Sequence, residues 1–123
     1  MNKYRDKSDF EINKAVAEKL GVKVYERSAG ILFTATKHRG EYTFTRFDPC
    51  NNPADAMPIV IENGISLINS DGVHFAAAPG CGIEGYLGGD TVGYGSRKYS
   101  ENENIYRAAM EVFLMMKDTE NES

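Results

Sequence analysis

The sequence is poor in the residues that build disulfide scaffolds and metal sites. Among 123 residues it has two cysteines, two histidines and no tryptophan. Cys50 and Cys81 are too few for a disulfide framework, and they lack the close spacing of cysteine zinc ligands. His38, His74 and Asp48 add no characteristic metal spacing to them. We therefore expect reduced thiols, no metal and no cofactor.

Long apolar runs are also absent. The longest, residues 112–116, is far shorter than the roughly 20 residues of a membrane-spanning helix. No apolar stretch follows the basic residues near the start, so neither a membrane association nor a secretory signal is predicted. The length and the apolar fraction of 41% fit one globular domain, residues 1–123, with frayed tails at 1–7 and 118–123.

Positive charge is in short supply overall but unevenly placed. The net charge of −4 argues against a dedicated nucleic-acid binder, so a nucleic-acid partner is not expected. Residues 1–46 nevertheless carry a net charge of +4, and residues 47–123 carry −8. If the first half forms one face, that face could meet an acidic partner. In the alternative, the two halves interleave and the asymmetry averages out.

Two segments have clear helix boundaries. Residues 8–20 begin with a capping box at Ser8 and Glu11, and Gly21 follows as a helix stop. Residues 53–63 begin after an Asn cap with proline at the first position. Pro58 removes a backbone hydrogen bond from this helix, so we expect a kink or a tight first turn.

A third helix is predicted over residues 101–117, with Ser100 or Asn104 as its cap. It is apolar nearly all round, which leaves only Arg107, Glu111 and Lys117 for water. Such a helix is either sandwiched in the core or shared with a second subunit. We expect a homodimer that forms through this helix.

The remaining pattern is that of strands. Residues 22–27, 31–37 and 42–47 alternate with a period of two, and short breaks between them predict an antiparallel meander. Further strands are predicted at 65–68 and 73–78. Threonines in the meander suit a sheet with one face in solvent: Thr34, Thr36, Thr43 and Thr45. The expected class is α+β, an alpha-beta sandwich with a mainly antiparallel sheet of about five to seven strands and three helices.

Three segments resemble a known family. They are SDFEINKAVAEKL (8–20), FDPCNNPADAMPIVIENGISL (47–67) and RAAMEVFLMMK (107–117). They resemble the NinX-like accessory proteins of lambdoid bacteriophages, whose function is unknown, and more distantly the phage alpha-beta-alpha sandwich domain. The resemblance implies a phage origin, a place in the host cytoplasm and the sandwich fold. It supplies no catalytic residues.

Residues 79–95 hold seven of the twelve glycines. Gly80, Gly82 and Gly85 read as G-x-G-x-x-G, but a poor helix start follows them and no βαβ unit surrounds them, so a dinucleotide site is not predicted. Tyr86-Leu87 and Thr91-Val92 predict a glycine-turn hairpin within this segment. The bare amides of such a loop can wrap an anion, while the alternative is a purely structural hairpin.

Cationic and aromatic residues near this loop complete a candidate ligand site. Arg97 and Lys98 lie in the acidic half, between the glycine loop and the last helix, and Arg46 could join them in a cationic rim beside three tyrosines that offer stacking surfaces. The candidate ligand-binding residues are Gly80, Gly82, Gly85, Tyr86, Tyr94, Arg97, Lys98, Tyr99 and Arg46.

Cys50 is a candidate nucleophile because it precedes the second helix, whose free amides would lower its pKa. A partner could be His38 or His74. The alternative is a small buried apolar side chain, with Asp48 and Asp55 serving as turn and cap.

No paired acid-base set, phosphate-binding loop or metal spacing points to catalysis, and no catalytic residue is predicted. We expect a non-enzymatic phage accessory protein that binds a host or phage partner. One alternative is the capture of a small, anionic, nucleotide-like signalling ligand, which would suit counter-defence. A second alternative is a Cys50-dependent enzyme.

Overall fold

The computed structural model describes residues 3–28, 30–79 and 99–122. Within these ranges the fold is α+β, with three helices and two three-stranded antiparallel sheets. The elements in chain order are α1 (Asp9–Leu20), β1 (Tyr25–Ser28), β2 (Ile31–His38), β3 (Glu41–Arg46), α2 (Pro53–Glu62), β4 (Ser66–Ser70), β5 (Val73–Ala77), β6 (Tyr99–Glu101) and α4 (Ile105–Glu122).

Local capping fixes the ends of α1 and α2, as the sequence predicts. The Ser8 hydroxyl accepts from the Glu11 amide, and the Glu11 carboxylate accepts from the Ser8 amide, both at 3.1 Å. Gly21 ends α1 in the left-handed conformation, with φ of 75°. The Asn52 side chain accepts from the Ala54 amide at 3.0 Å and starts α2.

The last helix begins and ends later than predicted. Asn104 is the cap, because its side-chain oxygen accepts from the amides of Tyr106 and Arg107, whereas Ser100 lies in β6. The helix continues to Glu122, beyond the end predicted at residue 117.

The N-terminal tail is also packed. Tyr4 is buried, and its hydroxyl donates to Asp118 on the last turns of α4. Each tail is polar in composition, and this hydrogen bond joins Tyr4 of one tail to Asp118 of the other.

The predicted meander is confirmed as the sheet β1-β2-β3, with Tyr25 paired to Phe33 and Ala35 paired to Phe44. The second sheet is β4-β5-β6, and its short strand β6 was not predicted. Among the described residues, two separate sheets therefore replace the single sheet that the pattern predicts. The hairpin predicted at 86–92 lies outside the described residues.

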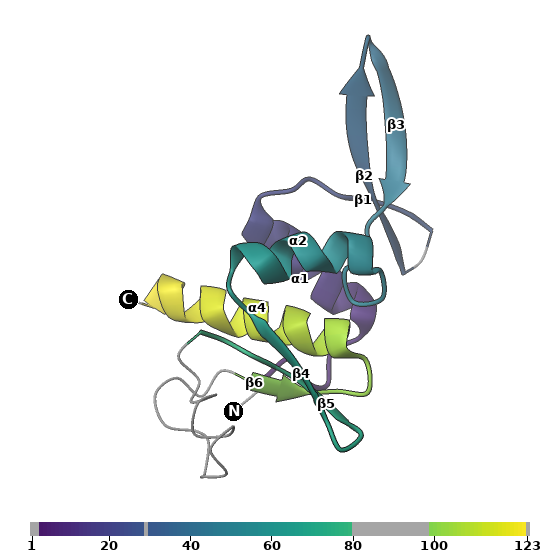
Figure 1. The fold of residues 1–123 in the computed structure, drawn as a ribbon. Coiled ribbons are helices and arrows are strands. Elements are labelled where there is room, and N and C mark those ends of the chain that lie inside the picture. The colour runs from purple at the N-terminus through teal and green to yellow at the C-terminus, as the bar shows by residue number, and fades with distance from the viewer. Residues whose placement is uncertain (1–2, 29, 80–98, 123) are drawn as a thin grey trace.

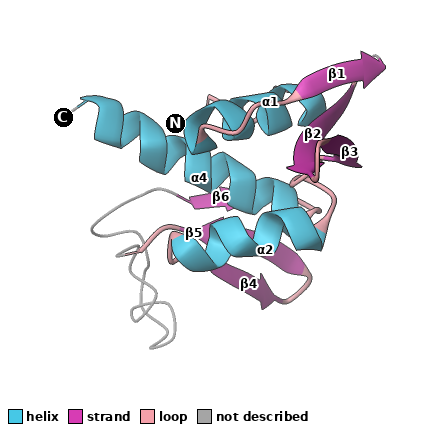
Figure 2. Ribbon diagram, turned by 90° about the horizontal axis from the view of Figure 1, so that it is seen from above, coloured by secondary structure: helices cyan, strands magenta, loops and turns pink. Residues whose placement is uncertain are grey.

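The helices form the centre of the molecule. Figure 2 shows α4 between α1 and α2, and Figure 1 shows β4, β5 and β6 below α4, while the ribbon of β2 and β3 projects away from the helices. Four apolar side chains of α4 are fully buried in this core: Met110, Val112, Phe113 and Leu114. Of the two alternatives for this helix, the structure shows the one in which it is enclosed by its own chain. No helix in the described ranges is long and apolar enough to cross a membrane.

Candidate functional site

Two charged residues of α4, Arg107 and Glu111, are buried in the core. Arg107 is 7% exposed and Glu111 is 1% exposed, so the prediction that they face water is wrong. Arg107 Nε lies 2.6 Å from Glu111 Oε2, one helical turn away. The two charges compensate each other, which is the condition under which a protein interior tolerates them.

Arg107 also fastens the N-terminal segment to α4. Its Nη1 donates to Asp9 Oδ1 at 2.6 Å, and its Nη2 donates to the carbonyls of Tyr4 at 3.0 Å and Lys7 at 2.6 Å. Burial lowers the pKa of Arg107, but the hydrogen bonds to Asp9 and Glu111 outweigh it and hold that pKa above its ordinary value. The charged Arg107 side chain therefore connects the N-terminal segment to α4 through these hydrogen bonds.

A second polar cluster holds the loop between β3 and α2. Asn13 on α1 donates to Asp48 Oδ1 at 2.8 Å and accepts from the Cys50 amide at 3.0 Å. Asn104 donates to the Cys50 carbonyl at 2.6 Å. Asp55 accepts from the Asp48 amide at 2.9 Å, and the Asp48 carbonyl accepts from the amides of Asn51 and Asn52, so both aspartates hold the turn before α2, while Asn52 is its cap.

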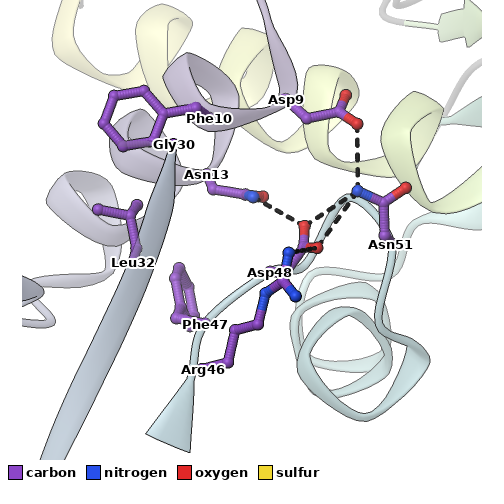
Figure 3. A pocket seen from close by; sticks show the side chains of 9 residues that line it. All are labelled: Asp9, Phe10, Asn13, Gly30, Leu32, Arg46, Phe47, Asp48 and Asn51. Atoms are coloured by element: carbon purple, nitrogen blue, oxygen red, sulfur yellow. Dashed lines mark hydrogen bonds and ion pairs between the residues drawn. The ribbon is translucent and has the colours of Figure 1, made fainter. Parts of the chain in front are cut away.

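A small cavity opens beside this cluster. Figure 3 shows its polar side, where Asn51 donates to Asp9 and Asp48 at 3.1 Å. Its volume is about 80 Å³, room for a few waters and well below the size of an ordinary ligand pocket. The nine lining residues are Asp9, Phe10, Asn13, Gly30, Leu32, Arg46, Phe47, Asp48 and Asn51.

The polar side chains that line this cavity form hydrogen bonds and an ion pair with one another. Across the described ranges, no buried side-chain nitrogen or oxygen lacks a hydrogen-bond partner, and no three histidine, cysteine or acidic residues gather as metal ligands. Arg46 Nη2 lies 3.6 Å from Asp48 Oδ2, so the positive charge of Arg46 partly compensates the negative charge of Asp48. The arrangement suits a structural junction between α1, α4 and the loop.

Cys50 is fully buried, and its sulfur lies 3.9 Å from the carbonyl oxygen of Asp9. Burial, with a smaller contribution from the Asp9 charge, raises the pKa of the Cys50 thiol. A thiol with a raised pKa is protonated at neutral pH and is a poor nucleophile. The structure thus agrees with the small buried side chain and opposes the lowered pKa that a reactive Cys50 requires.

The residues predicted to bind a ligand are mostly outside the described ranges: Gly80, Gly82, Gly85, Tyr86, Tyr94, Arg97 and Lys98. Tyr99 is 53% exposed at the start of β6, and Arg46 is exposed at the end of β3. These two residues lie on different sheets with the helices between them (Figure 1), so the structure does not bring them together.

The projecting ribbon carries an exposed surface that the sequence analysis missed. Register places Phe44 beside Ala35, Tyr42 beside Lys37 and Arg46 beside Phe33, so these side chains share one face. Tyr42 is 61% exposed, and Tyr25 and Phe44 are exposed as well. We call this surface the cation–aromatic face; it consists of Lys23, Tyr25, Arg27, Lys37, Tyr42, Phe44 and Arg46.

Cations lie over the rings of this face. The Arg27 guanidinium is 4.7 Å from the centre of the Phe44 ring, and Lys37 Nζ is 5.7 Å from that of Tyr42. Lys23 Nζ is 5.4 Å from the centre of the Tyr25 ring, which meets Phe44 edge-to-face at 5.8 Å. These distances fall within the range of cation–π attraction.

The two glutamates of these strands, Glu26 and Glu41, lie on the opposite face of the sheet. Glu26 pairs with Leu32, and Glu41 pairs with His38, so both glutamates belong to the opposite register. The alternation of Tyr42, Phe44 and Arg46 with threonines was the signal in the sequence. The threonine pattern suited a sheet with one face in solvent, but the aromatic face of the ribbon is exposed too.

Comparison with known proteins identifies a family. The sequence model of the family described as "Bacteriophage P22, NinX" matches residues 3–117. Nothing among the curated proteins and nothing among the solved structures matches the chain. Since the match spans nearly the whole sequence and includes all three segments on which the resemblance rested, the chain belongs to the phage P22 NinX family.

Proposed function

We propose that this phage accessory protein is a non-enzymatic binding module and that it binds its partner through the cation–aromatic face. The observation that carries the proposal is the exposure of Tyr25, Tyr42 and Phe44 together on a projecting ribbon. Exposed aromatic residues on one face are a common mark of interaction surfaces. Tyr and Arg, which this face contains, often dominate binding energy.

The two polar clusters described above stabilise the fold, which leaves the ribbon as the candidate binding surface. Arg107, Glu111 and Asp9 join the two ends of the chain, and Asn13 and Asn104 hold the loop that contains Cys50. The ribbon, in contrast, contributes few residues to the core: among the described residues of its strands, only Leu32 is buried. Packing against the core therefore does not constrain the residues of its outer half, which are available for binding.

We infer that the protein acts in the host cytoplasm, where phage proteins are synthesised, on a host or phage partner. The test is affinity capture from infected cells with the intact tagged chain and with Tyr42→Ala/Phe44→Ala. Ile61→Ala is the matched control, because Ile61 is 72% exposed on α2, away from the ribbon.

The expected result is one macromolecule that is captured by the wild type and by Ile61→Ala and lost with the double variant. Equal unfolding temperatures of the three proteins would show that the loss is local. Capture that is the same for all three proteins would contradict binding through the ribbon.

A second proposal concerns a small nucleotide-like ligand, whose capture would suit counter-defence. It is supported by Tyr99, an exposed ring at the point where the glycine-rich segment joins β6. An exposed aromatic ring can stack on a base.

A further inference from the structure

We propose that the cation–aromatic face binds single-stranded nucleic acid. This inference rests on the proposed binding function and names its partner. The chemistry that matches the face is a polymer in which every unit offers one anionic group and one planar ring. Phosphates would pair with Lys23, Arg27, Lys37 and Arg46, and unpaired bases would stack on the exposed rings.

The arrangement of rings and charges favours this partner over a protein. A protein interface has an apolar centre and a polar rim. On this face each exposed ring has a cation beside it instead: Arg27 at Phe44, Lys37 at Tyr42 and Lys23 at Tyr25. Cations and rings are interleaved, as phosphates and bases are in a single strand.

The register gives the face a regular spacing along the strand. Tyr42, Phe44 and Arg46 follow one another at every second position of β3, which corresponds to about 7 Å between neighbours on that face. A stretched chain can therefore meet two rings and one cation in succession. Across the ladder, Lys37 lies beside Tyr42 and adds a second row.

The net charge of the whole chain does not decide binding at this face. Glu26 and Glu41 belong to the opposite register, so the cations of the face have no acidic neighbour within the ladder. The exception is Arg46, which lies 3.6 Å from Asp48 at the base of the ribbon. Figure 1 shows the ribbon extending beyond the helices, and exposed charges more than about 10 Å apart are largely screened at ordinary salt.

Stacking distinguishes single strands from duplexes. The faces of paired bases are covered by their neighbours, whereas an unpaired base can leave the stack and lie on an aromatic ring. The same chemistry is present in single-stranded DNA and RNA, so the experiment includes both, with a duplex of the same sequence.

Binding is measured by fluorescence anisotropy with labelled oligonucleotides of about 20 bases, at about 50 and 200 mM salt. Three or four phosphate contacts on a single strand predict a loss of affinity of about 20- to 50-fold between these salt concentrations. The duplex is expected to bind more weakly than either single strand.

Variants test the two components separately. Tyr42→Ala removes a stacking ring, and its affinity should fall about tenfold. Lys37→Glu should weaken binding at least as much, because it replaces an attraction with a repulsion. Lys14→Glu makes the same charge change at an exposed position of α1 and should stay within about twofold of the wild type.

Several results would overturn the proposal. They are no anisotropy change with either single strand, equal affinity for the duplex, or an equal loss in Lys37→Glu and Lys14→Glu. Polyglutamate that competes as well as an unlabelled oligonucleotide would point to an acidic protein instead.

The two levels of inference fail separately. If the oligonucleotides do not bind but capture from infected cells still depends on Tyr42 and Phe44, the binding function stands and its nucleic-acid partner falls. If capture is unaffected as well, both proposals fall.

Discussion

Arg107 and Glu111 form an ion pair inside the last helix, with Nε and Oε2 2.6 Å apart and both side chains almost completely buried. Ser100 donates to the second oxygen of Glu111, also at 2.6 Å. The pair therefore connects β6, α4 and, through the other guanidinium nitrogens, the N-terminal segment. Any change that removes one charge leaves the other buried.

Glu111→Ala is expected to lower the free energy of unfolding by about 3 kcal/mol, because it removes the more deeply buried of the two carboxylates that pair with Arg107 and leaves Asp9 as the remaining one. The measurement is urea unfolding followed by circular dichroism. Glu120→Ala is the matched control, since Glu120 forms a more exposed pair with Lys117 and should cost about 0.5 kcal/mol or less. Equal losses in the two variants would contradict a structural role for the buried pair.

Cys50 is expected to react slowly with iodoacetamide at neutral pH, because burial raises its pKa and excludes the reagent. The experiment uses Cys81→Ser, so that Cys50 is the remaining thiol. Adding urea should bring the rate to that of free cysteine. Labelling of the folded protein as fast as that of free cysteine would restore the Cys50-dependent enzyme as a candidate.

The contact between Tyr4 and Asp118 is expected to give stability that depends on pH at both extremes. Burial and the hydrogen bond to Asp118 raise the pKa of Tyr4 above its ordinary value of 10.0, so the stabilisation is complete below pH 10 and is lost as the pH rises further. Burial raises the pKa of Asp118, but the bonds from Tyr4 and Lys3 outweigh it and lower that pKa below 3.8, so stability is lost as the pH falls through the acid range.

Tyr4→Phe removes this hydrogen bond with little change in volume. The difference in unfolding free energy between the wild type and Tyr4→Phe should be constant from pH 6 to 8, as the ordinary pKa values of Tyr and Asp imply, and should shrink beyond either limit. A difference that does not vary with pH would show that the contact is not formed in solution.

The small-ligand proposal predicts that cyclic or adenine-derived nucleotides raise the unfolding temperature and that Tyr99→Ala removes the effect. Thermal-shift measurements at about millimolar ligand provide the check. No shift above about one degree would remove this proposal, and Ile61→Ala at an exposed position of α2 serves as the control.

The homodimer expected through the last helix stays a prediction, although residues 107–114 of α4 are buried within their own chain. Sedimentation at tens of micromolar should give twice the chain mass of 13.6 kDa if a dimer forms. A mass near 13.6 kDa would contradict it.

The sequence predicted best what is decided by neighbours along the chain. The capping box of Ser8 and Glu11 and the cap by Asn52 form across three residues or fewer, so their residue types reveal them directly. Register in the meander follows in the same way from short turns and a period of two.

The errors concern contacts between distant segments. Arg107 meets Asp9 across 98 positions and the Tyr4 carbonyl across 103, and no local pattern contains those partners. The buried middle of α4 includes the charged residues Arg107 and Glu111, which the helical period alone cannot show. The aromatic face was predictable from alternation, but its exposure depends on how far the ribbon extends beyond the helices.

The helix that completes the core, α4, follows the other described helices and strands along the chain. α4 packs against α1, α2 and the strands β4 to β6. The apolar surfaces of these elements therefore remain uncovered while the preceding hundred residues emerge from the ribosome. The described core is therefore completed only after residues 105–122 have been synthesised. A nascent chain that stops short of residue 105 exposes that surface permanently and becomes a substrate for chaperones and proteases.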